Sequence, residues 1–256
     1  SPQGLILRFI PSLADWLSKQ PHLPRIQDDK VLLRKFLVNC KYRVQKAKTK
    51  IDQYYSCRTA HPQVYLNRDP TSAPSRPSRN SLAIVARADP NIADIIPMDY
   101  LRYLTMVLDI IFLEEEAKLD FIVIIDYRGF SFAHFLKLTT IASVCTEILL
   151  EVYPGQFKGE HCVYVPSFID SVVALFKRMV KPKLRDRIHV HKELDTFHDM
   201  VGKDFLPSDL GGSDKSIEEL NAPHSPTYEQ SNISSFLFKF VCLMCPLPPE
   251  IRESTC

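Results

Sequence analysis

Residues 121–125 of this chain read Phe-Ile-Val-Ile-Ile and are apolar at every position. A strand with one face in water alternates apolar and polar side chains, whereas a strand covered on both faces does not. Sheets become covered on both faces when helices cross over between parallel strands. This run therefore predicts a buried parallel strand inside an α/β domain.

Other segments of the chain fit the same architecture. Short apolar runs predict three further strands, and the longer segments between them predict helices. The alternation of strand and helix indicates a mostly parallel sheet with right-handed crossovers. The predicted strands are residues 82–87, 121–126, 161–165 and 187–191, and the predicted helices are residues 100–116, 134–152, 168–180 and 194–203.

The first part of the chain has a different rhythm. Between residues 13 and 60, apolar side chains such as Leu33, Phe36 and Leu37 recur at helical spacing, which predicts a small helical subdomain. Residues 67–80 are rich in Pro, Ser and Arg, a composition typical of an exposed linker. We therefore expect three parts, whose bounds are 1–70 for a helical unit, 81–220 for the α/β domain and 221–256 for a C-terminal tail.

Charge and cysteine content narrow the class of protein. The 32 basic and 30 acidic residues leave a net charge of +2, which argues against a nucleic-acid partner. The seven cysteines are an odd number in mostly apolar surroundings, which favours a reducing cytoplasm. The apolar run at residues 236–247 contains Lys239 and Pro246 and is too short to span a membrane. We expect a cytoplasmic monomer.

The signatures of enzymes built on such sheets are missing. The chain has only seven glycines, no glycine-rich phosphate loop and no G-x-S-x-G nucleophile turn. Asp126 ends the predicted central strand, where α/β enzymes often place a catalytic or metal-binding carboxylate. The alternative, that Asp126 caps the turn at residues 127–129, is favoured because turns select Asp for its side-chain hydrogen bonds. We expect no catalytic residue.

Two groups of side chains suggest metal chemistry only weakly. His189, His191 and His198 could approach one another, but no Cys or carboxylate is spaced to complete a metal site. Cys242 and Cys245 form a single C-x-x-C pair without a second pair, so packing of the core or tail is favoured. We therefore expect neither a metal nor a cofactor.

The α/β part carries many large apolar side chains, which fit either a plain core or a lined cavity. Periodicity alone favours the plain core. These residues are Tyr100, Tyr103, Val107, Phe121, Val123, Ile125, Ile148, Leu149, Phe168, Phe176, Met179 and Val180.

A series of short motifs, in order along the chain, resembles the CRAL-TRIO family of lipid-binding proteins. The resemblance is to the animal group of this family, which includes the tocopherol-transfer and retinaldehyde-binding proteins. The resemblance covers about residues 10 to 220. The motifs are DWLSKQPHLP at 15–24, DKVLLRKFL at 29–37, NRDP at 67–70, IIDYRGFSFAH at 124–134, RIHVH at 187–191 and LPSDLGG at 206–212.

The resemblance implies a helical N-terminal region followed by an αβα domain whose sheet floors a hydrophobic cavity. It also implies that a mobile gate helix, here residues 168–180, closes this cavity. The positions that match the lining of the cavity are Tyr103, Val107, Phe121, Val123, Ile125, Leu138, Ile148, Leu149, Tyr153, Phe168, Ile169, Met179 and Val180.

The resemblance also implies a basic patch beside the gate that contacts phosphoinositide head groups at a membrane. Its positions match Lys158, Lys183 and Arg187, with Arg185 nearby, whereas Gln156 replaces a further basic residue. Clustered cations bind phosphate through charge-assisted hydrogen bonds. An ordinary solvated basic surface is the alternative.

Glu160 departs from the family, because it stands where an apolar strand residue usually lines the cavity. If it points inward, it binds a polar ligand end or has a pKa raised by loss of hydration. The function expected from the resemblance is therefore transfer between membranes of a hydrophobic molecule, such as a tocopherol, retinoid, carotenoid or other terpenoid. A scaffold with a collapsed cavity that acts through protein contacts is the alternative.

Overall fold

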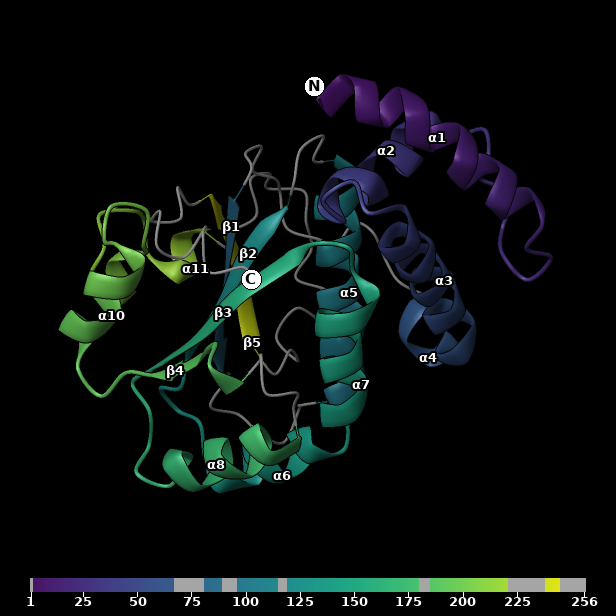
Figure 1. The fold of residues 1–256 in the computed structure, drawn as a ribbon. Coiled ribbons are helices and arrows are strands. Elements are labelled where there is room, and N and C mark those ends of the chain that lie inside the picture. The colour runs from purple at the N-terminus through teal and green to yellow at the C-terminus, as the bar shows by residue number, and fades with distance from the viewer. Residues whose placement is uncertain are drawn as a thin grey trace, which may run out of the picture.

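The computed structural model describes residues 2–66, 81–88, 96–114, 119–179, 185–220 and 238–244. A twisted sheet lies at the centre, helices cover both of its faces, and the N-terminal helices pack beside one helical layer (Figure 1). This arrangement confirms the expected α/β class with a helical N-terminal region. Met179 is described only as backbone, and Val180, Lys183 and Cys245 lie outside the described residues.

The N-terminal helices form as their apolar spacing predicts, but the first begins well before residue 13. Asp29 caps the second helix, because its carboxylate accepts a hydrogen bond from the Leu32 backbone N–H at 2.9 Å. Lys41 and Tyr42 then take positive φ angles, which turn the chain back into the third helix. The helices are α1 (Pro2–Ser18), α2 (Lys30–Asn39), α3 (Val44–Ala60) and α4 (Pro62–Tyr65).

The described sheet has five strands in the order β4-β3-β2-β1-β5. The first four are parallel, as predicted, and β5 pairs antiparallel with β1. This last strand lies in the segment expected as a tail, whose packing the sequence does not decide. The strands are β1 (Ser81–Ala88), β2 (Asp120–Asp126), β3 (Gln156–Val163), β4 (Ile188–Val190) and β5 (Phe238–Met244).

Two predicted boundaries are wrong. Strand β3 begins at Gln156 instead of residue 161, because Lys158 and Glu160 conceal its apolar pattern. The single helix predicted over 134–152 is broken near Thr140, whose hydroxyl bonds back to the Lys137 carbonyl at 2.7 Å. The helices of the α/β part are α5 (Pro97–Glu114), α6 (Phe132–Thr139), α7 (Ala142–Glu147), the π-helix η3 (Ile148–Val152), α8 (Ile169–Met179), α10 (Leu194–Val201), the 3₁₀ helix η4 (Ser208–Leu210) and α11 (Ile217–Leu220).

Strand β2 serves two separate hydrophobic cores, which explains why it has no polar side chain between Phe121 and Ile125. Phe121 and Val123 pack with α5 and the N-terminal helices. Ile122 and Ile124 pack on the opposite face with α10 and α11. In Figure 1 these two helical layers lie on either side of the sheet.

Candidate functional site

The sheet face toward α5 and α7 collects nearly all the apolar residues predicted to line a cavity. Ten of the predicted residues belong to one hydrophobic cluster, namely Tyr103, Val107, Phe121, Val123, Ile125, Leu138, Ile148, Leu149, Tyr153 and Phe168. A further predicted residue, Ile169 of α8, is buried but belongs to neither of the two core clusters.

A β-bulge decides which way Glu160 points. The pairing runs Phe121 with Phe157 and then Ile122 with Gly159, so that Lys158 is the extra residue. Glu160 consequently lies opposite Val123 and shares its face of the sheet. Without the extra residue, Glu160 would lie opposite Ile124 and face the other core, because a shift of one residue exchanges the two faces.

Glu160 lies among polar groups from three other elements, which we call the Glu160 cluster. Cys162 donates a long hydrogen bond from its Sγ to Glu160 Oε1 at 3.6 Å. Cys162 also hydrogen-bonds Tyr127, and Tyr100 hydrogen-bonds Cys145. The cluster comprises Tyr100 of α5, Tyr127 after β2, Cys145 of α7, and Glu160 and Cys162 of β3.

Burial controls the protonation of this cluster. Loss of hydration raises the pKa of Glu160, and this effect outweighs the Cys162 hydrogen bond and the positive charge of Lys177 on α8, which both lower it. Burial also raises the pKa of Cys145 to about 12 and holds the Tyr100 and Tyr127 phenols well above their ordinary pKa. The thiols and phenols therefore carry protons at neutral pH, so the cluster offers several neutral donors around one carboxyl group.

Most residues of the cluster nevertheless keep some accessible surface. Tyr100, Tyr127, Cys145 and Glu160 are half-buried, whereas Cys162 is fully buried. The same four side chains lose enough hydration for burial to dominate their pKa shifts. Each of these four side chains therefore has some accessible surface although burial removes most of its hydration.

The segment predicted as a gate forms helix α8. Its N-terminal neighbour Phe168 stacks on Phe130 with ring centroids 6.4 Å apart and meets Phe132 edge-on at 6.0 Å. Asp170 forms an exposed ion pair with Lys192 at 3.3 Å. These contacts join α8 to the start of α6 and to the chain after β4, beside the lower end of the sheet in Figure 1.

The structure corrects one member of the predicted phosphoinositide patch. Lys158 is 3% exposed, and its ammonium lies 3.7 Å from Asp120 Oδ2, so it is not available to a head group. Arg187 is half-buried and donates a hydrogen bond to the Phe157 carbonyl at 2.5 Å. Gln156 is half-buried too, whereas Arg185 is exposed. Among the described residues, Arg185 and Arg187 are therefore the members that retain accessible surface.

Asp126 acts as a turn-capping and charge-balancing residue. It is fully buried and accepts hydrogen bonds from the Arg128 backbone N–H at 3.1 Å and from Arg87 Nε at 2.7 Å. Arg87 also pairs with Asp209 at 3.0 Å. The Arg128 guanidinium pairs with Asp126 as well, at 2.5 Å. These bonds confirm the interpretation of Asp126 as a turn residue and show that two guanidinium groups neutralise it.

The histidines predicted as weak metal candidates have other partners. His191 lies 3.1 Å from His161, ring nitrogen to ring nitrogen, and His161 also stacks on His189. His198 bonds instead to the Leu210 carbonyl at 2.7 Å. Burial lowers the pKa of His161 to about 3 and that of His191 to about 4. His161, His189 and His191 thus form a stack whose pKa values are lowered by burial, which the alternation of His189 and His191 alone does not reveal.

A separate open pocket of about 510 Å³ lies beside this stack, at β4 and α10. Its lining mixes charged and apolar side chains, and it is distinct from the Glu160 cluster. The lining residues are Ile188, His189, Val190, His191, Lys192, Glu193, Thr196 and Met200.

Comparison with known proteins identifies a matching family and several similar proteins. The sequence profile of the CRAL/TRIO domain matches residues 64–212, and that of the Pinta-like UBA domain matches residues 6–75. The chain is 28% identical over 226 residues to the human "Alpha-tocopherol transfer protein-like", which covers 81% of this chain and 65% of that protein. It is 36% identical over 118 residues to rat "Clavesin-1", across 45% of this chain and 33% of the relative.

The chain therefore spans slightly less than two thirds of the length of the first of these relatives. A solved structure described as "Crystal structure of Sfh5" superposes with a TM-score of 0.52 at 14% identity, covering 87% of this chain and 91% of that one. This likeness supports the fold alone. No described helix is both long and apolar enough to cross a membrane.

Proposed function

The chain belongs to the CRAL/TRIO family, which binds lipophilic ligands, and we propose that it holds a hydrophobic molecule with one polar end between its sheet and helices α5, α7 and α8. The observation that carries this proposal is the Glu160 cluster, in which every side chain except Cys162 is desolvated and yet partly accessible. Surface of this kind is expected where residues line internal space instead of bulk water.

The apolar part of the proposed site supplies the affinity. Phe121, Val123 and Ile125 project from β2 toward Tyr103 and Val107 of α5. Burial of apolar surface is worth about 25 cal/mol per Å², so covering about 200 Å² of a ligand contributes about 5 kcal/mol. This driving force depends little on the identity of the ligand, which is why we define the ligand by its class.

The Glu160 cluster supplies the recognition of the polar end. Because the pKa of Glu160 is raised, its carboxyl group can be protonated when it donates a hydrogen bond to the ligand. The carbonyl oxygen of the same carboxyl group still accepts a hydrogen bond. A ligand hydroxyl satisfies both, because it accepts from the acid and donates to an oxygen. We therefore propose a hydroxyl-bearing lipid, such as a terpenoid or fatty alcohol, as the ligand class.

Ligand entry and release are assigned to α8. Its described contacts include the stacking of its neighbour Phe168 and the exposed Asp170–Lys192 pair, and exposed ion pairs stabilise by at most about 1 kcal/mol. Elements that cover a ligand site in this way open and close in many proteins, which lets the ligand pass. We propose that the protein exchanges its ligand at a membrane from the cytoplasm, as a carrier and not as an enzyme, with Arg185 and Arg187 among the groups facing phosphate.

Filling the proposed site tests this function. Val123→Trp adds a large ring beside Glu160, whereas Val31→Trp makes the same change on α2, where Val31 is 64% exposed. We expect native mass spectrometry to find a bound lipid on the purified chain and on Val31→Trp, and to find it lost from Val123→Trp.

The same experiment separates the carrier from the scaffold alternative. A folded Val123→Trp variant that keeps the full complement of lipid would contradict the proposed site. A wild-type chain that accepts no member of a broad lipid panel would instead favour a scaffold that acts through protein contacts.

A further inference from the structure

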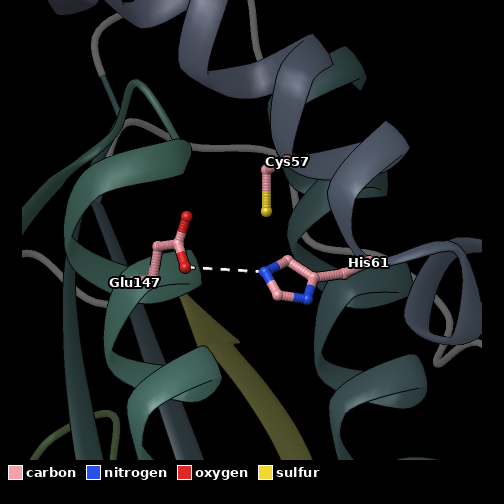
Figure 2. A group of neighbouring side chains, drawn as sticks. All are labelled: Cys57, His61 and Glu147. Atoms are coloured by element: carbon pink, nitrogen blue, oxygen red, sulfur yellow. Dashed lines mark ion pairs between the residues drawn. The ribbon is translucent and has the colours of Figure 1, made fainter.

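We propose that Cys57, His61 and Glu147 bind a divalent transition-metal ion, for which Zn²⁺ is the best match. Figure 2 shows the three side chains converging on one point between two helices. Their ligand atoms all lie within 4.8 Å of one another, and His61 Nε2 is 3.5 Å from Glu147 Oε2. Across the residues that the structure describes, no other His, Cys, Asp and Glu side chains form such a group of three.

The helical framework explains the convergence. Cys57 lies in the last turn of α3, and His61 follows the helix and closes that turn, because its backbone N–H donates to the Cys57 carbonyl at 2.9 Å. This bond holds the two residues one helical turn apart. Glu147 ends α7, directly before the π-helix η3. Helix α3 packs against η3, where Lys50 donates a hydrogen bond to the Glu151 carbonyl. This packing brings Cys57 and His61, at the C-terminal end of α3, to Glu147 of α7.

The donor set matches the coordination chemistry of zinc. Zn²⁺ takes Cys sulfur at about 2.3 Å, His nitrogen at about 2.0 Å and carboxylate oxygen at about 2.1 Å, with water often as a fourth ligand. In a tetrahedron with these bond lengths the donor atoms are about 3.3 to 3.7 Å apart. The observed spacings reach up to 4.8 Å, and the Glu147 side chain is 50% exposed, so it has room to rotate toward an ion. A thiolate ligand disfavours Mg²⁺ and Ca²⁺.

The surroundings of Cys57 support a bound thiolate. Cys57 is 4% exposed, so its sulfur is shielded from bulk solvent. The Tyr65 hydroxyl lies 3.7 Å from Sγ and can donate a hydrogen bond to the thiolate. Such outer contacts orient and stabilise metal ligands.

A metal at this position would tie the N-terminal helices to α7. This helix also carries Cys145 of the Glu160 cluster, so the site connects the helical unit to the wall of the proposed lipid site. The inference does not rest on lipid binding, because it concerns different residues and a different ligand. Since the ion binds the folded chain, metal binding should raise the thermal unfolding midpoint.

Cobalt provides the direct test. After treatment of the full chain with a chelator, Co²⁺ is added and the thiolate-to-cobalt charge-transfer absorption is followed, and Zn²⁺ is then used to displace it. We expect one Co²⁺ per chain, an absorption that Cys57→Ser abolishes, and an affinity that falls about tenfold or more in His61→Gln and Glu147→Gln. Cys40→Ser, which removes another buried cysteine of the helical unit, is the matched control and should bind as wild type.

Three results would overturn the proposal. They are a wild-type chain without the charge-transfer absorption, an absorption that persists in folded Cys57→Ser, and an absorption lost equally in Cys40→Ser. If circular dichroism shows that Cys57→Ser does not fold, Glu147→Gln decides, because its side chain is half exposed. Unchanged cobalt affinity in that variant would then contradict the site.

Discussion

At the scale of single residues, Glu160 departs most from an ordinary hydrophobic lining. A lone carboxyl group on an apolar sheet face is costly, because burial removes its hydration. The Cys162 hydrogen bond and the charge of Lys177 reduce this cost, and the part that remains raises the pKa of Glu160. We interpret this cost as the consequence of recognising a polar ligand end.

Replacing Glu160 should separate stability from recognition. Glu160→Leu removes the desolvated carboxyl and should leave stability unchanged or raise it by about 1 to 3 kcal/mol. The same variant should bind a long-chain alcohol about 10 to 100 times more weakly while binding the matched hydrocarbon as before. Equilibrium binding measurements check this, with Glu160→Gln as the variant that keeps hydrogen-bonding groups. Equal losses for both ligands would contradict the assigned role.

The histidine stack predicts how stability depends on pH. Burial lowers the pKa of His161 from 6.5 to about 3, so the folded chain keeps this ring neutral where the unfolded chain protonates it. The free energy of unfolding is therefore highest above pH 6.5 with respect to His161. It falls by about 1.4 kcal/mol per pH unit as the pH decreases from 6.5 toward about 3. Urea unfolding across this range should show the loss, and His161→Gln should reduce its slope. Identical slopes would show that His161 is not responsible.

At the scale of secondary-structure elements, local irregularities position the site. The bulge at Lys158 turns Glu160 toward α5, and the break after α6 allows α7 and η3 to run beside α3. Helix α8 follows β3, and Phe168 and the buried Ile169 lie at its N-terminal end. The regular elements thus supply the apolar surface, and the bulge places the polar Glu160 on it.

Loosening the attachment of α8 should speed ligand exchange. An aromatic pair contributes about 0.5 to 1.5 kcal/mol, so Phe168→Ala, which removes both ring contacts, should accelerate ligand transfer to acceptor vesicles about tenfold. Leu136→Ala on α6 is the control, because Leu136 is 54% exposed. A fluorescent-lipid transfer assay measures both rates. A Phe168→Ala rate equal to wild type would argue that the ligand leaves by another route.

At the scale of the whole molecule, a polar network joins the N-terminal helices to the α/β part. Asp109 of α5 accepts hydrogen bonds from the Tyr54 hydroxyl at 2.9 Å and the Tyr153 hydroxyl at 2.7 Å, and it pairs with Arg58. Arg58 also lies 3.5 Å from the centroid of the Tyr54 ring. Because the side chains of this network are buried or nearly buried, removing one of them should lower the free energy of unfolding of the whole protein.

Asp109→Asn should therefore destabilise the protein strongly. Removing one charge from a buried, hydrogen-bonded pair typically costs about 3 to 5 kcal/mol, because the partner charge stays buried. Asp15→Asn breaks an exposed ion pair with Lys19 and should change stability by less than about 0.5 kcal/mol. Chemical denaturation of both variants checks the difference. Equal effects would show that the network does not hold the two parts together.

The sequence predicts those features of the structure that depend on neighbouring residues in the chain. The run at 121–125 predicts the central strand because its periodicity reports burial on both faces, and the ordered motifs predict the family. The positions of Lys158 and Glu160 depend on one inserted bulge residue, which no periodicity reveals. The meeting of Cys57 with Glu147 depends on the packing of α3 against η3, which directly follows α7 and is distant from α3 in the chain.

The most direct test of the central claim is to locate the bound lipid. A photoactivatable long-chain alcohol, cross-linked to the full chain and mapped by mass spectrometry, should label peptides of α5, β2 and β3, and excess unlabelled alcohol should suppress this labelling. Labelling confined to residues 188–200, which line the open pocket at β4 and α10, or labelling that competitor does not suppress, would contradict a ligand held beside Glu160.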